Sequence, residues 1–176
     1  MIDESHYWKQ PLLKAATWLQ RLRIKPQSQQ ALVRLEREIF VGFYAIRKLT
    51  DTMKLTHKIK AMTFPLLVHP CVKRVDYMNC HKIDEFYDLQ STTTELRDLA
   101  YLCNQFIHSY VYRAVISEDQ RVDGFYVSSD RSRQKHLYFV TRASVLTAFR
   151  SVGRDDPTHF VLSRNHATGQ WADVVK

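Results

Sequence analysis

Polar side chains suited to acid–base and phosphate chemistry gather on one face of a helix predicted over residues 92–113. They are spaced four, three and four residues apart: Arg97, Tyr101, Asn104 and His108. On a helix this spacing puts all four opposite the apolar stripe. An imidazole exchanges protons near neutral pH and can contact a phosphate. Asn104 and His108 are therefore candidate catalytic residues, with hydrogen bonding inside the fold as the alternative.

The run Leu102–Tyr110 (LCNQFIHSY) is similar to the signature of HEPN domains, helical domains of many prokaryotic toxins and defence ribonucleases. The family motif is an arginine, often followed by an asparagine, and then a histidine late on a helix. Asn104 and His108 match the last two, whereas Cys103 stands where the arginine belongs. The resemblance covers about residues 28–113 and implies metal-independent RNA cleavage at a site shared by two protomers. A cysteine cannot hold a phosphate as a guanidinium does, so RNA binding is favoured over efficient cleavage.

The same run, taken with Gly124–Arg131 (GFYVSSDR), resembles a group of uncharacterised bacterial proteins. That second resemblance implies no function. The HEPN resemblance implies an RNA partner, a homodimer and a place in a defence or toxin–antitoxin system. The β-rich part that follows is not a feature of a plain HEPN domain.

Basic residues are concentrated between positions 44 and 74, where Asp51 is the only acidic residue. This segment supplies most of the net charge of +8. Cations interleaved with aromatic side chains such as Tyr44 and Phe64 suit a single nucleic-acid strand. An ordinary solvated face is the alternative. The predicted nucleic-acid-binding residues of this segment are Arg47, Lys48, Lys54, Lys58, Lys60, Lys73 and Arg74.

Two other charged segments offer binding surfaces. Arg131, Arg133 and Lys135 alternate in a polar loop, so an extended loop would point all three one way, toward a phosphate or an acidic partner. A solvated loop is the alternative. Residues 84–98 carry five carboxylates against Arg97 alone. Opposed basic and acidic patches support a second hypothesis, a non-enzymatic protein–protein interaction module or inhibitor.

Metal and cofactor chemistry has little support in the sequence. Adjacent Cys80 and His81, with His69 and Cys71 upstream, lack the separation usual between paired zinc ligands. No metal and no cofactor is therefore expected. The motifs GxxxxGK[ST], GxGxxG, GxSxG and HExxH do not occur, which argues against P-loop nucleotide hydrolysis, dinucleotide redox chemistry and zinc proteolysis.

The length of 176 residues suits one domain, which we expect to span 1–176. A pI of about 9.5 favours polyanionic partners. The polar N-terminus does not resemble a signal peptide, and no apolar run is long enough to span a bilayer. Three cysteines cannot all pair within the chain, so reduced thiols are expected. These features predict a cytoplasmic protein without membrane association.

The spacing of apolar residues predicts an α+β fold, with a helical part over 1–115 and a β-rich part over 120–176. The helical part is expected to be a bundle of about three main helices. Gly42, on the apolar stripe of the helix predicted over 28–53, indicates that another element approaches this helix closely. The β-rich part is expected to be antiparallel hairpins with a short helix. Helices are predicted at 7–23, 28–53, 81–89, 92–113 and 142–152, an edge strand at 64–70, and paired strands at 124–129 with 135–141 and 159–163 with 171–175, the last pair turning near 165–169.

Overall fold

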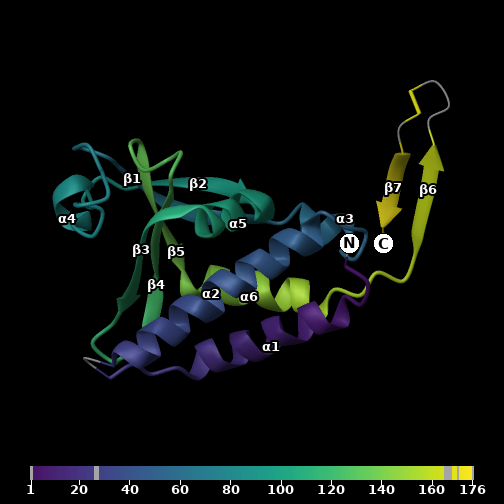
Figure 1. Cartoon of the computed structure of the whole chain (residues 1–176), viewed down its shortest axis with the longest axis horizontal. Helices are drawn as coiled ribbons and strands as arrows, with labels where there is room; N and C mark the ends of the chain where they lie inside the picture. The colour runs from purple at the N-terminus through teal and green to yellow at the C-terminus, as the bar shows by residue number, and fades with distance from the viewer. Residues whose placement is uncertain (1, 26–27, 165–167, 170, 176) are drawn as a thin grey trace.

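The computed structural model describes residues 2–25, 28–164, 168–169 and 171–175. Figure 1 shows helices packed against a five-stranded sheet, with a separate two-stranded hairpin at the C-terminal end. The α+β class predicted from the sequence is confirmed. In chain order the elements are α1 (His6–Arg21), α2 (Gln29–Thr50), α3 (His57–Lys60), β1 (Thr63–Pro70), α4 (Ile83–Phe86), β2 (Thr93–Asp98), α5 (Leu99–Ile107), β3 (Ser109–Ile116), β4 (Val122–Ser129), β5 (His136–Thr141), α6 (Arg142–Arg154), β6 (Phe160–Arg164) and β7 (Trp171–Val175).

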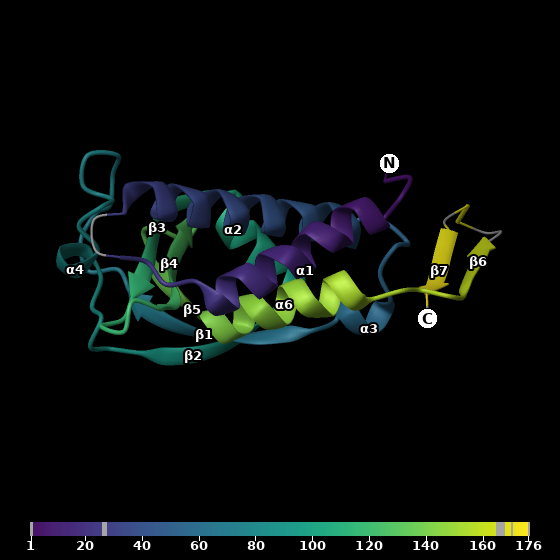
Figure 2. The same ribbon diagram turned by 90° about the horizontal axis from the view of Figure 1, so that it is seen from below.

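The large sheet is antiparallel throughout, with its strands in the order β2-β1-β5-β4-β3. Both α5 and α6 pack on β4, α2 packs on α5, and α1 packs against α2 and α6. In Figure 2 the three helices α2, α1 and α6 lie side by side along the sheet. Because β1, β2 and β3 begin before residue 115, the N-terminal part is two long helices with strands rather than a bundle of three.

The long helix α2 follows the predicted apolar stripe from Leu35 to Leu49. Outside this stripe, Leu32 in the first turn of the helix is 39% exposed, and Met53, within the predicted helix but beyond the end of α2, is 42% exposed. Gly42 confirms the predicted close approach, since a Cβ there would overlap the ring of Phe149 on α6. A hydrogen at this position is what lets the two helices meet.

An aromatic cluster joins the helices to the sheet at the centre of the core. Phe43 stacks on Phe106 of α5 with ring centroids 4.1 Å apart and meets Phe149 edge-on at 5.3 Å. Phe106 in turn meets Phe125 of β4 at 6.1 Å. Such offset and edge-on pairs add to the free energy gained by burying the rings. One side chain of α2 therefore packs against both helices that cover the sheet.

The single helix predicted over 92–113 is wrong, because this segment forms β2, α5 and β3. Residues 93–98 pair with β1 in register, and Asp98 begins α5 by accepting a hydrogen bond from the Tyr101 backbone N–H (2.7 Å). The helix ends at Ile107, and the run Ser109–Ile116, rich in β-branched and aromatic residues, pairs with β4.

The prediction that residues 64–70 form an edge strand is also wrong. β1 is an interior strand, paired with β2 on one side and β5 on the other. Pairing with β5 covers only Leu67–Pro70, so Pro65 lies where β1 has a single neighbour. Pro70 is the last residue of the strand. Pro65, with one side of β1 unpaired, and Pro70, at the end of the strand, thus lie where a missing backbone N–H is tolerated.

The remaining elements agree more closely with the predictions made from the sequence. The hairpin of β4 and β5, the helix α6 and the pairing of β6 with β7 are confirmed. The helix predicted at 81–89 is reduced to the four residues of α4. The turn predicted near 165–169 lies partly outside the described residues. Within the described ranges, no helix combines the length and the apolarity that crossing a bilayer requires.

Tyr112 of β3 gives a prediction about stability in alkali. Its ring lies 4.8 Å from that of Phe40, and its hydroxyl is buried without a hydrogen-bond partner among the described residues. Burial raises the pKa of this phenol above its usual value. Because the folded-state pKa lies above the unfolded pKa of about 10, the neutral phenol contributes its full stability below pH 10. That stability is lost as the pH rises from the unfolded pKa through the folded pKa, by up to about 1.4 kcal/mol per pH unit.

We therefore expect Tyr112→Phe to be as stable as the wild type at neutral pH and more stable than it at about pH 11. The measurement is the free energy of unfolding by urea at both pH values. Tyr87, whose pKa burial also raises, donates a hydrogen bond to the Arg133 carbonyl (2.8 Å), so Tyr87→Phe should lose stability even at neutral pH. An equal alkaline loss in Tyr112→Phe and the wild type would contradict the prediction.

Candidate functional site

A cleft of about 740 Å³ lies beside α5, between that helix and the turn that joins β4 to β5. The last turn of α2, together with β2 and β5, supplies the rest of its wall. Its lining residues are Arg47, Arg97, Tyr101, Asn104, Gln105, His108, Ser129, Asp130, Arg131, Ser132, Lys135, His136 and Tyr138.

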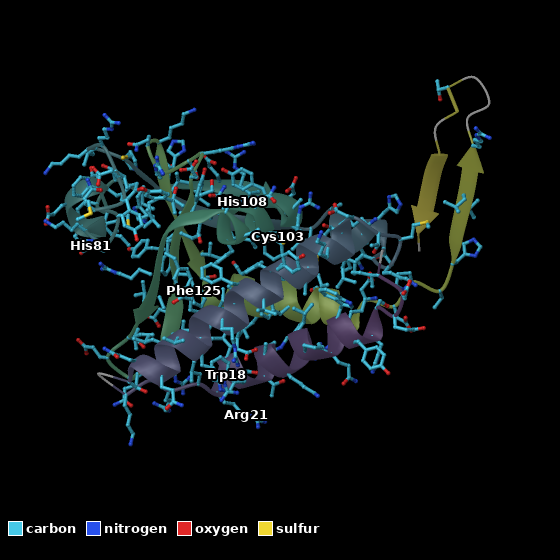
Figure 3. The ribbon with its side chains drawn as sticks, in the orientation of Figure 1. Trp18, Arg21, His81, Cys103, His108 and Phe125 are labelled. Atoms are coloured by element: carbon cyan, nitrogen blue, oxygen red, sulfur yellow. The ribbon has the colours of Figure 1, made fainter. Side chains whose placement is uncertain are left out.

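The four polar residues predicted to share a face do line this one cleft. Tyr101, Asn104 and His108 come from α5 and its C-cap, whereas Arg97 comes from the end of β2. The side chain of His108 is exposed, and its backbone N–H donates to the Asn104 carbonyl (3.1 Å), which ends the helix. Figure 3 places His108 at the end of α5, away from the core. These residues are therefore accessible to a ligand.

The predicted basic loop is a tight turn that presents two of its three cations to the cleft. Arg131 and Lys135 line the cleft. Arg133 does not, because its guanidinium stacks 3.7 Å from the ring centroid of Tyr110 and pairs with Asp130. The alternation expected for an extended loop is therefore replaced by a division of roles between binding surface and packing.

The predicted basic patch over residues 44–74 is not one surface. Arg47, on α2, is its only member that lines the cleft. Lys73 and Arg74 lie beside α4, at the end of the molecule remote from α3, which carries Lys58 and Lys60 (Figure 1). Lys48 and Lys54 lie on α2 and in the turn after it. Because β1 runs between the two groups, residues close in sequence are carried to opposite ends of the sheet.

The predicted acidic patch is likewise divided among local contacts. Asp84 pairs with Arg113 (3.3 Å), and Glu85 with Lys82 (3.6 Å). Glu95 pairs with Arg97, and Asp98 caps α5. Most carboxylates of the segment therefore have partners in the fold.

A buried polar network, which the sequence did not reveal, holds the turn in place. Gln105 Oε1 accepts hydrogen bonds from the Ser129 backbone N–H (3.0 Å) and from Ser132 Oγ (2.9 Å). Ser128 Oγ lies 3.0 Å from Ser132 Oγ and donates to the His136 carbonyl (2.7 Å). The other members of the network are all buried: Gln105, Ser128, Ser129 and Ser132. A satisfied network of this kind fixes one conformation, so the cations of the turn are held in position before a ligand binds.

The side chains that line the cleft carry a net positive charge. Four cationic side chains line it, and Asp130, already paired with Arg133, is the only carboxylate of the lining. Arg47 and Arg97 are paired with Asp51 and Glu95. For Arg131 and Lys135 the described part of the chain shows no ion-pair partner. These two cations are thus the ones most available to an anion.

Tyr101 gives the cleft an aromatic surface, and its ring meets that of the buried Tyr138 edge-on. The hydroxyls of Tyr101 and Tyr138 are 2.6 Å apart, and the Arg97 guanidinium lies 4.7 Å from the Tyr101 ring centroid. Burial and this hydrogen bond raise the pKa of Tyr138, so it stays a neutral phenol. The half-buried Tyr101 ring beside the Arg97 guanidinium offers a surface on which a base can stack.

Cys103, at the position where the HEPN motif carries an arginine, does not line the cleft. Its side chain is fully buried, on the side of α5 that faces α2 (Figure 3). Burial raises the pKa of the thiol, which makes it an unreactive core residue. Any cation that serves His108 must therefore come from another part of the chain.

No group of three or more histidine, cysteine or acidic side chains among the described residues is placed to hold a metal ion. Comparison with family models, with curated proteins and with solved structures found no match to this chain.

Proposed function

We propose that the protein binds single-stranded RNA in the cleft beside α5. The observation that carries the proposal is that four cations from α2, β2 and the β4–β5 turn line one cleft with a single, already paired carboxylate. Phosphate contacts from lysine and arginine supply most of the affinity for a nucleic-acid strand. The half-buried Tyr101 adds an aromatic surface on which a base can stack.

The resemblance of Leu102–Tyr110 to the HEPN signature supports RNA as the polyanion. A cytoplasmic location, a homodimer and a role in a defence or toxin–antitoxin system are parts of the same proposal. The basic pI favours a polyanionic partner as well.

The test is a binding measurement with a labelled single-stranded RNA, by fluorescence anisotropy over a range of salt concentrations. The double variant Arg131→Glu/Lys135→Glu should bind at least about 10-fold more weakly than the wild type at moderate salt. If each residue contacts one phosphate, the slope of log affinity against log salt should fall by about 1.4, since each contact to a single strand contributes about 0.7.

The matched control is Lys73→Glu/Arg74→Glu, which makes the same change in net charge at two exposed residues that do not line the cleft. This control should keep most of the affinity. Equal losses in the two double variants would mean that net charge alone attracts RNA, and failure of the wild type to bind at moderate salt would overturn the proposal.

A further inference from the structure

Two histidines from separate elements line the same basic cleft. His108 is the C-cap of α5 and His136 is the first residue of β5. His108 is exposed and His136 is half-buried, so both imidazoles can meet a ligand. Of the pair, only His108 stood out in the sequence, because His136 reaches the cleft through strand pairing.

The backbones of both histidines are bonded to one turn. The His108 carbonyl accepts a hydrogen bond from the Asp130 N–H (3.0 Å). The His136 N–H donates to the Ser132 carbonyl (2.9 Å), and its carbonyl accepts from Ser128 Oγ (2.7 Å). None of these bonds uses an imidazole. The backbones of both histidines are therefore fixed by the fold, and these bonds leave the imidazoles available for chemistry.

Strand β4 separates the two histidines. Ser109, next to His108, pairs with Ser129, and Val127 of the same strand pairs with Tyr138 of β5. Two strand spacings put the backbones of the two histidines roughly 10 Å apart. Side chains that extend from both sides into one cleft can flank a single phosphodiester bound between them.

Arg131 and Lys135 lie in the same lining, in the turn that carries the backbone bonds of the histidines. Cations fixed beside a reacting phosphate stabilise the charge that develops on its oxygens in the transition state. The cleft thus combines two groups that can transfer protons with two cations that can stabilise charge on a phosphate.

We propose that His108 and His136 act as a general acid–base pair that cleaves the RNA bound in this cleft by internal transphosphorylation. One imidazole, neutral, takes the proton of a ribose 2′-hydroxyl as its oxygen attacks the adjacent phosphorus. The bond between phosphorus and the 5′-oxygen of the next nucleotide breaks, and the other imidazole, protonated, gives its proton to that oxygen. The products are a 2′,3′-cyclic phosphate and a 5′-hydroxyl, with no change in oxidation state. This inference rests on the proposed RNA binding and adds His136, from the same chain, as the second proton-transfer residue beside His108.

The test uses the full chain with a labelled single-stranded RNA in the presence of EDTA, and identifies the ends of the products by mass spectrometry. The wild type should give 2′,3′-cyclic phosphate ends and should leave the all-2′-deoxy strand of the same sequence intact. His108→Ala and His136→Ala should each lower the rate at least about 100-fold, the usual contribution of a general acid or base. His81→Ala, at an exposed histidine next to α4, should cleave like the wild type.

Binding of the all-2′-deoxy strand is measured in parallel for every variant. Because the backbone bonds of both histidines survive truncation to alanine, the variants should fold, and thermal unfolding checks this. If the wild type binds RNA without cleaving it, the inference is overturned and the proposed function stands. If the wild type neither binds nor cleaves RNA, the inference and the proposed function are both overturned. Cleavage that survives the histidine changes, or that acts on the deoxy strand, also overturns the inference.

Discussion

Phe43→Ala is expected to lower the free energy of unfolding by about 3–5 kcal/mol, the usual cost of truncating a buried phenylalanine. The ring is fully buried and contacts Phe106 of α5 and Phe149 of α6 at the same time. Its removal leaves a cavity between both helices that cover the sheet. Neither helix can close the cavity without leaving β4, so little relaxation is available.

Urea unfolding followed by circular dichroism gives this free energy. Val41→Ala is the control on the same helix, because Val41 is 59% exposed and its truncation should change stability by no more than about 0.5 kcal/mol. A loss below about 1 kcal/mol for Phe43→Ala would contradict the prediction, since it would place the ring outside a close-packed core.

Gln105→Ala is expected to cost about 2–4 kcal/mol and to weaken RNA binding as well. The Gln105 carbonyl oxygen accepts from the Ser129 N–H and from Ser132 Oγ, and all three residues are buried. Truncation leaves two buried donors to find other partners, which costs about 1–3 kcal/mol for each one left unpaired. It also releases the turn that presents Arg131 and Lys135 to the cleft.

Asn104→Ala provides the neighbouring control. Asn104 is half-buried, and within the described residues no side-chain hydrogen bond of it is seen, so its truncation should cost less than about 0.5 kcal/mol. Differential scanning calorimetry separates the two variants. Equal stabilities would show that the network around Gln105 does not hold the turn.

The long helices could be predicted from the sequence because burial alone determines their pattern. The stripe from Leu35 to Leu49 repeats at helical spacing over several turns, and the structure buries it as expected. The segment 92–113 could not be predicted in this way. Leu99, Cys103 and Phe106 keep helical spacing because they lie on α5, but Leu96 fits the same pattern while lying exposed on β2. Strand pairing with β1 overrides local periodicity there.

The site was predictable only where its residues share one segment. Tyr101, Asn104 and His108 lie on α5 or at its cap, so their spacing placed them together. His136 lies in the cleft through the pairing of β5, and Gln105 gains its role from serines 24 and 27 positions away. No local pattern encodes such partners. The density of serine in the run 128–132 was the one available signal, and it indicated a turn rather than a network.

The place of β5 in the sheet also governs when the fold can be completed. β5 lies between β1 and β4, yet it is the last of the five strands along the chain. As the chain emerges from the ribosome, β1 with β2 and β3 with β4 are two separate strand pairs, each with an edge that lacks its neighbour. Such edges can pair with other chains. Synthesis of residues 136–141 joins the two pairs and covers both edges at once, so a nascent chain that stalls earlier is at risk of aggregation.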